Sequence, residues 1–262
     1  MSLNEKTVLV TRAANQAKTF RTLLEKEGAN VIEMAALEIR PPSTWEDLNQ
    51  AILEISSFDW LILTSANGVK SFFERLERLN IDRALLDPLK IAVVGKKTAT
   101  VLEKQGVKPD FIPSNFVADS LVSSFPEPLS GKKILFPRVE SGGRDVLIHE
   151  FRKQNAEVIA VAAYQSCCPE NADPIAVQAL QENQVDIITF ASSKTVQHFC
   201  NLLTPVFGSM VNLKSALANV LIASIGPQTS ATCQQLLGRY DLEAKEYTLE
   251  GLVNCLVEAQ KK

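Results

Sequence analysis

The chain contains two copies of one sequence pattern, and this repeat limits the folds that it can adopt more than any other feature. Three blocks recur at nearly constant offsets of 126, 127 and 131 residues. The first pair, KTVLVTR with KKILFPR, aligns Arg12 with Arg138. The second pair, FDWLILTSANGV with VDIITFASSKTV, aligns Ser65 with Ser192. The third pair, KIAVVGKKTA with LIASIGPQTS, aligns Gly95 with Gly226. A shared offset over three separated blocks indicates a duplicated unit of about half the chain.

Within each copy, short apolar strands alternate with segments of helical period. WLIL, IAVV, IITF and LIASI are almost continuously apolar, which is typical of strands buried on both faces of a sheet. Between them, Phe20, Leu23 and Leu24, or Val69, Phe72 and Phe73, recur with the spacing of a helix. This order predicts the α/β class, with two similar domains of parallel sheets flanked by helices, and it places the strand-to-helix loops at the carboxyl edge of each sheet.

Prolines indicate where the domains end. Pro41-Pro42 and Cys167-Cys168-Pro169 each stop a repeated strand, at equivalent points of the two copies, so both are candidate linkers. Pro126 and Pro128 mark a further break, so a tandem division near residue 129 is an alternative. The residue pattern alone leaves both divisions open.

Composition excludes several classes of protein. The hydrophobic fraction of 46% and charged fraction of 22% are those of a globular chain, and no apolar run approaches the about 20 residues of a membrane span. MSLNEKTVLVTR has no signal-peptide core, so we expect a cytoplasmic protein. A net charge of −3 argues against nucleic acid as a partner. Five cysteines without a CxxC pair, and two histidines, predict reduced thiols and no metal site.

Four polar loops follow apolar strands and precede helices. They are Thr64–Asn67, Gly95–Thr98, Ala191–Lys194 and Gly226–Thr229. Their hydroxyl and amide side chains can cap the helices, and the same helix N-termini, with nearby lysines, can bind carboxylate or phosphate. The glycine-rich run from Ser141 to Asp145 is either a further anion-binding loop or a flexible one. GKKT lacks the first glycine of a P-loop, because that position is Lys90, and no GxGxxG, HExxH or GxSxG occurs.

Seven motifs follow one another along the chain: VLVTR, LTSANGV, VVGKKTA, GKKILFPR, EVIAVAAYQS, ITFASSKTV and ASIGPQTSAT. Together and in this order, they resemble the uroporphyrinogen-III synthase family over nearly the whole chain. The resemblance implies two α/β domains joined by two extended connections, with the substrate in a cleft between them. Carried onto this chain, residues 1–38 and 168–262 form the first, discontinuous domain and residues 42–163 the second. Residues 39–41 and 164–167 are then the linkers.

The resemblance also implies the reaction. Hydroxymethylbilane, a linear tetrapyrrole with eight carboxylates, is closed to uroporphyrinogen III with loss of water and inversion of ring D through a spiro intermediate. This is a cofactor-independent lyase reaction of porphyrin biosynthesis, the route to haem and chlorophyll, and it depends chiefly on a held substrate conformation. We expect no metal or organic cofactor, no membrane or nucleic-acid partner, a monomer, and transient contact with hydroxymethylbilane synthase.

Tyr164, in AYQS, matches the tyrosine that the family places in its cleft, where the hydroxyl helps the leaving hydroxyl depart. The expected substrate-binding residues are Arg12, Thr64, Ser65, Asn67, Gly95, Lys96, Thr98, Arg138, Gly142, Gly143, Ser192, Ser193, Gly226, Gln228 and Thr229. Arg12 and Arg138 have structural roles as an equal alternative, pairing with carboxylates at the sheet edge. The competing function is a non-catalytic, two-domain cytosolic protein that binds a small anion.

Overall fold

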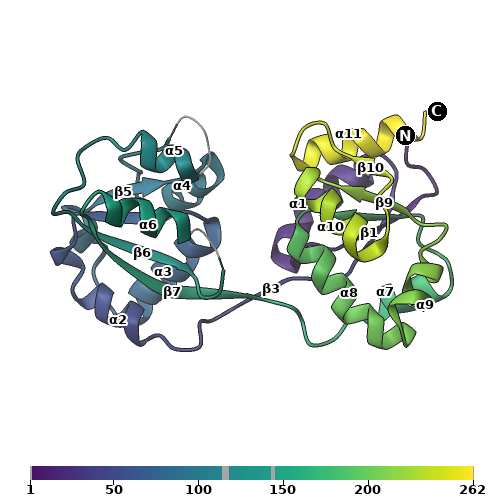
Figure 1. Cartoon of the computed structure of the whole chain (residues 1–262), viewed down its shortest axis with the longest axis horizontal. Helices are drawn as coiled ribbons and strands as arrows, with labels where there is room; N and C mark the ends of the chain where they lie inside the picture. Colours follow the sequence, from purple (N-terminus) through teal and green to yellow (C-terminus); the bar gives the residue numbers. More distant parts are fainter. Residues whose placement is uncertain (1, 114–117, 143–144, 262) are drawn as a thin grey trace. The chain divides into compact units, whose positions relative to one another are not determined.

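The computed structural model describes residues 2–113, 118–142 and 145–261, and it divides into two compact units (Figure 1). Unit 1 comprises Met1–Glu38 and Cys167–Lys262, and unit 2 comprises Ile39–Ser166. The chain therefore passes from one unit to the other twice, once in each direction.

Unit 1 is built on a five-stranded parallel sheet. Its strands, in spatial order, are β10 (Leu242–Glu243), β9 (Leu221–Ser224), β8 (Ile187–Phe190), β1 (Thr7–Val10) and β2 (Asn30–Glu33). Every neighbouring pair runs parallel. The strand order reverses direction between β1 and β8, as in doubly wound α/β folds, where ligands bind outside the carboxyl ends of the strands.

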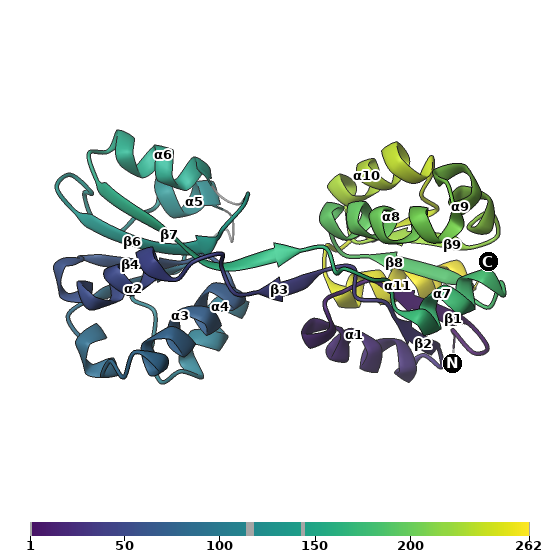
Figure 2. The ribbon, with the colours of Figure 1, turned by 90° about the horizontal axis from the view of Figure 1, so that it is seen from below.

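Helices cover both faces of this sheet (Figure 2). One face carries α1 (Ala14–Lys26) and α11 (Leu249–Ala259), and the other carries α7 (Pro174–Gln181), α8 (Ser193–Phe207), α9 (Met210–Ala216) and α10 (Pro227–Leu237). Phe20 and Leu24 of α1 are fully buried on the first face. On the second face, the rings of Phe190 and Phe199 meet edge to face with centroids 5.2 Å apart. The continuously apolar strands are buried on both sides by these layers.

Unit 2 contains a second five-stranded sheet. Its order is β3 (Glu38–Arg40), β7 (Glu157–Cys167), β6 (Lys133–Val139), β4 (Trp60–Leu63) and β5 (Lys90–Val93). The pairs β7–β6, β6–β4 and β4–β5 are parallel, and Phe111 adds an isolated parallel bridge to Ala92 of β5, beyond the edge strand. Strand β7 continues through residues 164–167 and β3 includes residues 39–40, where the family resemblance implies linkers.

The helices of unit 2 form the same two layers (Figure 2). On one face lie α2 (Glu46–Leu53), α3 (Ala66–Arg78) and α4 (Lys96–Glu103), with the 3-10 turns η1 (Ile55–Ser57) and η2 (Arg83–Leu86). The other face carries α5 (Ala118–Ser123) and α6 (Asp145–Lys153). The predicted α/β class with parallel, helix-flanked sheets is confirmed. No helix in the described ranges has both the length and the apolar character that crossing a bilayer requires.

Four strands of each sheet share one topology, β9-β8-β1-β2 in unit 1 and β5-β4-β6-β7 in unit 2, and each unit is assembled crosswise from the two sequence repeats. Unit 1 combines β1 and β2 of the first repeat with β8, β9 and β10 of the second. Unit 2 combines β6 and β7 of the second repeat with β4, β5 and the Phe111 bridge of the first. The crosswise pair β1–β8 of unit 1 joins residues 179 positions apart, such as Val8 and Ile187, and the crosswise pair β4–β6 of unit 2 joins residues 74 positions apart, such as Trp60 and Ile134.

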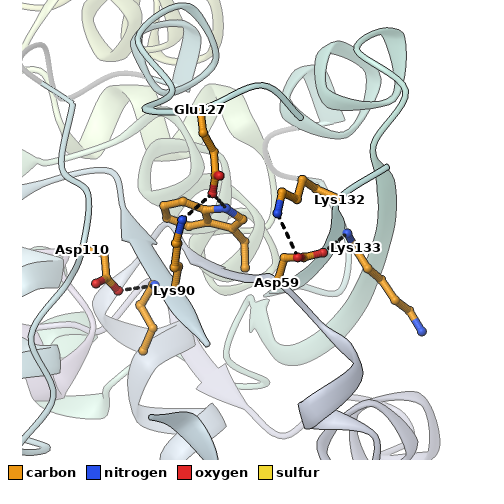
Figure 3. Close-up of polar contacts among 8 residues, drawn as sticks. Asp59, Lys90, Asp110, Glu127, Lys132 and Lys133 are labelled. Atoms are coloured by element: carbon orange, nitrogen blue, oxygen red, sulfur yellow. Dashed lines mark hydrogen bonds and ion pairs between the residues drawn. The ribbon is translucent and has the colours of Figure 1, made fainter. Parts of the chain in front are cut away.

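Equivalent aspartates hold this crosswise pairing at the amino ends of the central strands. In unit 2, Asp59 accepts hydrogen bonds from the Lys133 amide at 2.8 Å and from Lys132 Nζ at 3.1 Å (Figure 3). In unit 1, Asp186 accepts in the same way from the Thr7 amide at 2.8 Å and from Lys6 Nζ at 3.0 Å. Each carboxylate ties a strand of one repeat to a strand of the other.

Two further carboxylates, of Glu127 and Asp110, lie at the same edge of unit 2. Glu127 accepts hydrogen bonds from Trp60 Nε1 at 2.7 Å and from Lys90 Nζ at 2.8 Å, and Asp110 accepts one from the Ile91 amide at 2.7 Å (Figure 3). Charged and polar groups at the amino edge are thus bonded to one another. The loops for which the sequence predicts a function lie at the opposite, carboxyl edge.

Candidate functional site

In unit 2, the predicted catalytic tyrosine contacts one of the predicted loop serines. Tyr164 lies on β7 with 9% of its surface exposed, and its hydroxyl oxygen is 3.0 Å from Ser65 Oγ. Ser65 precedes α3 and also accepts a hydrogen bond from the Gly68 amide at 3.0 Å. A Cβ at Gly68 would lie 3.3 Å from Ser65 Oγ, so the glycine leaves room for this close approach. Ser65 therefore joins the start of α3 to the tyrosine hydroxyl.

Glu140, a residue that the sequence did not indicate, holds the backbone at Tyr164 with its amide and contacts Ser43 and Gln165 with its carboxylate. The Glu140 amide donates to the Tyr164 carbonyl at 2.8 Å. The Glu140 carboxylate accepts from the Ser43 amide at 2.9 Å and from Gln165 Nε2 at 2.6 Å. Hydrogen bonds from Ser43 and then Gln165 lower the pKa of Glu140. Because the partners lie far apart in the chain, no spacing rule would have found this group.

The other unit 2 loop residues lie at two neighbouring helix starts. Thr64 follows β4 and Asn67 lies in the first turn of α3, both half-buried. Gly95 precedes α4 with an extended backbone and supplies no side-chain acceptor to it, while Thr98 in the first turn is buried. Lys96 begins the same helix. Helix α4 thus starts without the serine cap that α3 has.

Arg138 organises the glycine-rich turn that follows β6. Its Nη1 lies 2.5 Å from the Asp145 carboxylate, and its Nη2 donates to the Gly142 carbonyl at 2.8 Å. Only 13% of the Arg138 side chain is exposed, and Gly142 has a left-handed φ of 69°. These contacts agree with the structural alternative for Arg138. Gly143, also predicted to bind substrate, lies outside the described residues.

Unit 1 carries the equivalent pair of helix starts. Ser192 precedes α8 and accepts a hydrogen bond from the Thr195 amide at 3.2 Å. Gly226 precedes α10 without a side-chain cap. Ser193 Oγ donates to the Gln228 carbonyl at 3.0 Å, which brings the two loops together. Four of the predicted substrate-binding residues therefore form one group at this edge, and Thr229 is buried behind them.

Arg12 lies just beyond β1 in unit 1. Its neighbour Thr11 is fully buried and donates to the Thr189 carbonyl at 2.8 Å, which anchors this end of the strand to β8. Burial lowers the pKa of the Arg12 guanidinium. A half-buried cation at the carboxyl edge attracts carboxylates more strongly than a solvated one, because water screens it less.

Hydroxyls, helix-start amides and cations therefore dominate the candidate site of each unit. Within the described residues, no three side chains of histidine, cysteine, aspartate or glutamate gather into a metal-binding group. His198 lies elsewhere, with Nδ1 2.7 Å from the Ala36 carbonyl. This set of groups suits the binding of several carboxylates, and Tyr164 is the one predicted acid among them.

Comparison with known proteins identifies close relatives. The family model described as uroporphyrinogen-III synthase HemD matches residues 18–254. The uroporphyrinogen-III synthase of Synechococcus elongatus is 50% identical over 248 residues, covering 95% of this chain and 93% of that protein. The uroporphyrinogen-III synthase of Chlorobaculum parvum is 28% identical, covering 98% and 100%. The crystal structure of uroporphyrinogen-III synthetase from Helicobacter pylori has the same fold, with a TM-score of 0.65 at 16% identity and coverage of 97% and 99%.

Proposed function

The chain belongs to the uroporphyrinogen-III synthase family, and we propose how its residues bind and cyclise hydroxymethylbilane. It is an enzyme of porphyrin biosynthesis that catalyses a lyase-type ring closure, and the observation that carries this is the 50% identity to a synthase over 95% of the chain. The roles of individual residues below are our proposal.

Substrate carboxylates bind at the four helix starts along the carboxyl edges of the two sheets. Gly95 and Gly226 leave the first turns of α4 and α10 without a side-chain acceptor. A carboxylate from the substrate can accept from such amides and is favoured by the positive end of the helix dipole. Hydroxyls of the other two loops and the side chains of Arg12 and Lys96 add further donors and positive charge, while Arg138 holds the glycine-rich turn through Gly142 and Asp145.

Tyr164 assists the departure of the terminal hydroxyl. If Ser65 donates its proton to the Tyr164 oxygen, the phenolic proton is left to point toward the substrate and the tyrosine becomes a better-positioned acid. Transfer of that proton releases water and leaves an azafulvene cation. The substituted carbon of ring D attacks it, the spiro intermediate rearranges with ring D inverted, and the proton lost on rearomatisation restores the phenol.

The protein must also hold the substrate so that ring D attacks through its crowded, substituted carbon. This attack must be faster than the spontaneous closure that gives isomer I. Binding of several of the substrate's carboxylates at helix starts would supply this orientation, since fixing a reactive conformation lowers the barrier. We further propose that the protein works as a cytoplasmic monomer on the route to haem and chlorophyll. It would receive hydroxymethylbilane from its synthase by transient contact.

The direct test is to add purified protein to freshly generated hydroxymethylbilane without added cofactor, oxidise the product and separate the uroporphyrin isomers. Predominant isomer III is the expected result. Isomer I formed at the uncatalysed rate would contradict the function and favour a non-catalytic protein that binds an anionic ligand.

A further inference from the structure

Tyr247 is an exposed aromatic residue beside one of the proposed carboxylate-binding helix starts, outside the sequence motifs of the site. It lies in the loop between β10 and α11, and 65% of its surface is exposed. We propose that the ring of Tyr247 binds the face of a pyrrole ring of the linear tetrapyrrole, next to the start of α10. This inference rests on the proposed function and adds a substrate contact to it.

The first observation is the contact between Tyr247 and Gly226. A Cβ added at Gly226 would lie 3.0 Å from Cδ1 and 3.3 Å from Cγ of the Tyr247 ring. The backbone of Gly226 is extended, with φ 169° and ψ 177°, and any residue adopts this conformation. The glycine is therefore explained by the ring that occupies the space and not by backbone strain. Tyr247 rests directly on the residue that begins α10.

The second observation is that the loop carrying Tyr247 is fixed at both ends. Strand β10 pairs in parallel with β9, so this loop leaves the same edge of the sheet as the loop that begins with Gly226. A chain of hydrogen bonds runs from Ser224 to Ser230, whose buried hydroxyl oxygens are 2.5 Å apart, and from Ser230 to the half-buried Glu243 carboxylate of β10. On the other side of Tyr247, Thr248 caps α11 through the Gly251 amide at 2.9 Å. The ring is thus presented by a rigid support.

The chemistry of the substrate fits this arrangement. Each ring of a linear tetrapyrrole has a flat apolar face and carboxylate side chains at its periphery. An aromatic ring beside a helix start can contact the pyrrole face while the helix amides donate hydrogen bonds to the carboxylate. By the offset of 131 residues, the position equivalent to Tyr247 in the first repeat holds another aromatic residue, Phe116, which lies outside the described residues.

The test compares three variants by steady-state kinetics and by the isomer composition of the product. Tyr247→Ala should raise KM about threefold to tenfold, the size of an aromatic contact, whereas Tyr247→Phe should keep a KM near that of the parent. Tyr240→Ala is the matched control, because Tyr240 is 41% exposed and precedes β10 at the opposite edge of the same sheet. Its kinetics should not change.

A double variant separates stacking from loss of structure. Gly226→Ala should raise KM in the parent by displacing the ring, and it should have a smaller effect when Tyr247→Ala is already present. If Tyr247→Ala fails to fold, Tyr247→Leu keeps an apolar side chain over Gly226 and removes only the aromatic face, so it should show the same rise in KM.

A parent-like KM in a folded Tyr247→Ala or Tyr247→Leu protein would overturn the inference while leaving the synthase function intact. Failure of the unsubstituted protein to form isomer III would instead remove the function on which the inference rests.

Discussion

The hydroxyl oxygen of Tyr164 lies 3.0 Å from Ser65 Oγ, although the two residues are 99 positions apart in the chain. Ser65 also accepts a hydrogen bond from the Gly68 amide in the first turn of α3. The tyrosine hydroxyl is therefore positioned through a helix cap. A change at Ser65 should affect both the stability of α3 and the reactivity of Tyr164.

Tyr164→Phe should lower kcat by about a hundredfold, the lower end of the range for loss of a general acid, and leave KM nearly unchanged. The ring remains to fill its buried position, so the melting temperature should change little. Steady-state kinetics and thermal unfolding check the two statements. Parent-like kcat in the folded variant would remove Tyr164 from the reaction.

Ser65→Ala should destabilise the protein by about 1 kcal/mol through loss of the helix cap, and should also lower kcat because Tyr164 loses its partner. Ser209→Ala is the control, since Ser209 caps α9 through the Asn212 amide at 3.1 Å and has no place in the proposed site. The control should lose a similar amount of stability with unchanged kcat. Equal kcat in the two variants would show that the Ser65 contact does not act on Tyr164.

Asp59→Asn should lower the free energy of unfolding by about 1–2 kcal/mol near neutral pH, because it removes charge-assisted hydrogen bonds to the amide of Lys133 and to Lys132. The Lys133 amide is the largest cause of the lowered pKa of Asp59. A carboxylate with a lowered folded-state pKa stabilises the protein above its unfolded pKa, about 4, and loses this effect as pH falls through the folded pKa.

The difference in stability between the parent and Asp59→Asn should therefore be constant from about pH 6 to 8 and shrink below about pH 4. Denaturant unfolding at several pH values measures it, with the exposed Asp87→Asn as control. A difference that grows on acidification would contradict the assignment.

Cys200 and Cys233 should resist alkylation in the folded protein. Burial raises the pKa of Cys200 to about 11 and that of Cys233 to about 12. Since the thiolate is the nucleophile, iodoacetamide at pH 8 should label the half-buried Cys167 first and reach the other two only after unfolding. Peptide mass spectrometry gives the order, and early labelling of Cys200 or Cys233 would contradict their burial.

Much of the fold follows from the sequence, because its signals are local. The apolar strands Trp60–Leu63 and Ile187–Phe190 have the predicted bounds. Ser65 and Ser192 cap helices, which is one of the two roles predicted for their loops. The repeat offset correctly made these two serines equivalent. Local pattern and turn chemistry were sufficient for these elements.

Residue patterns did not settle which strands pair, because the alternatives are chemically alike. Strand β1 pairs with β8 and not with β4, although β4 and β8 have the same length and are both buried throughout. Only long-range packing distinguishes these two possible partners of β1. The contacts of Glu140 with Ser43 and of Tyr247 with Gly226 also arise from long-range packing. Each joins loops that are separated in the chain, so neither periodicity nor spacing predicts it.

The most direct test of the proposed site is amide hydrogen exchange, measured anaerobically with and without the uroporphyrinogen III product. Binding should slow exchange in the first turns of α3, α4, α8 and α10, and leave the amino-edge amides of Thr7 and Lys133 unchanged. Slower exchange confined to other regions, with those four turns unaffected by bound tetrapyrrole, would contradict the proposal that helix starts of both units bind the substrate.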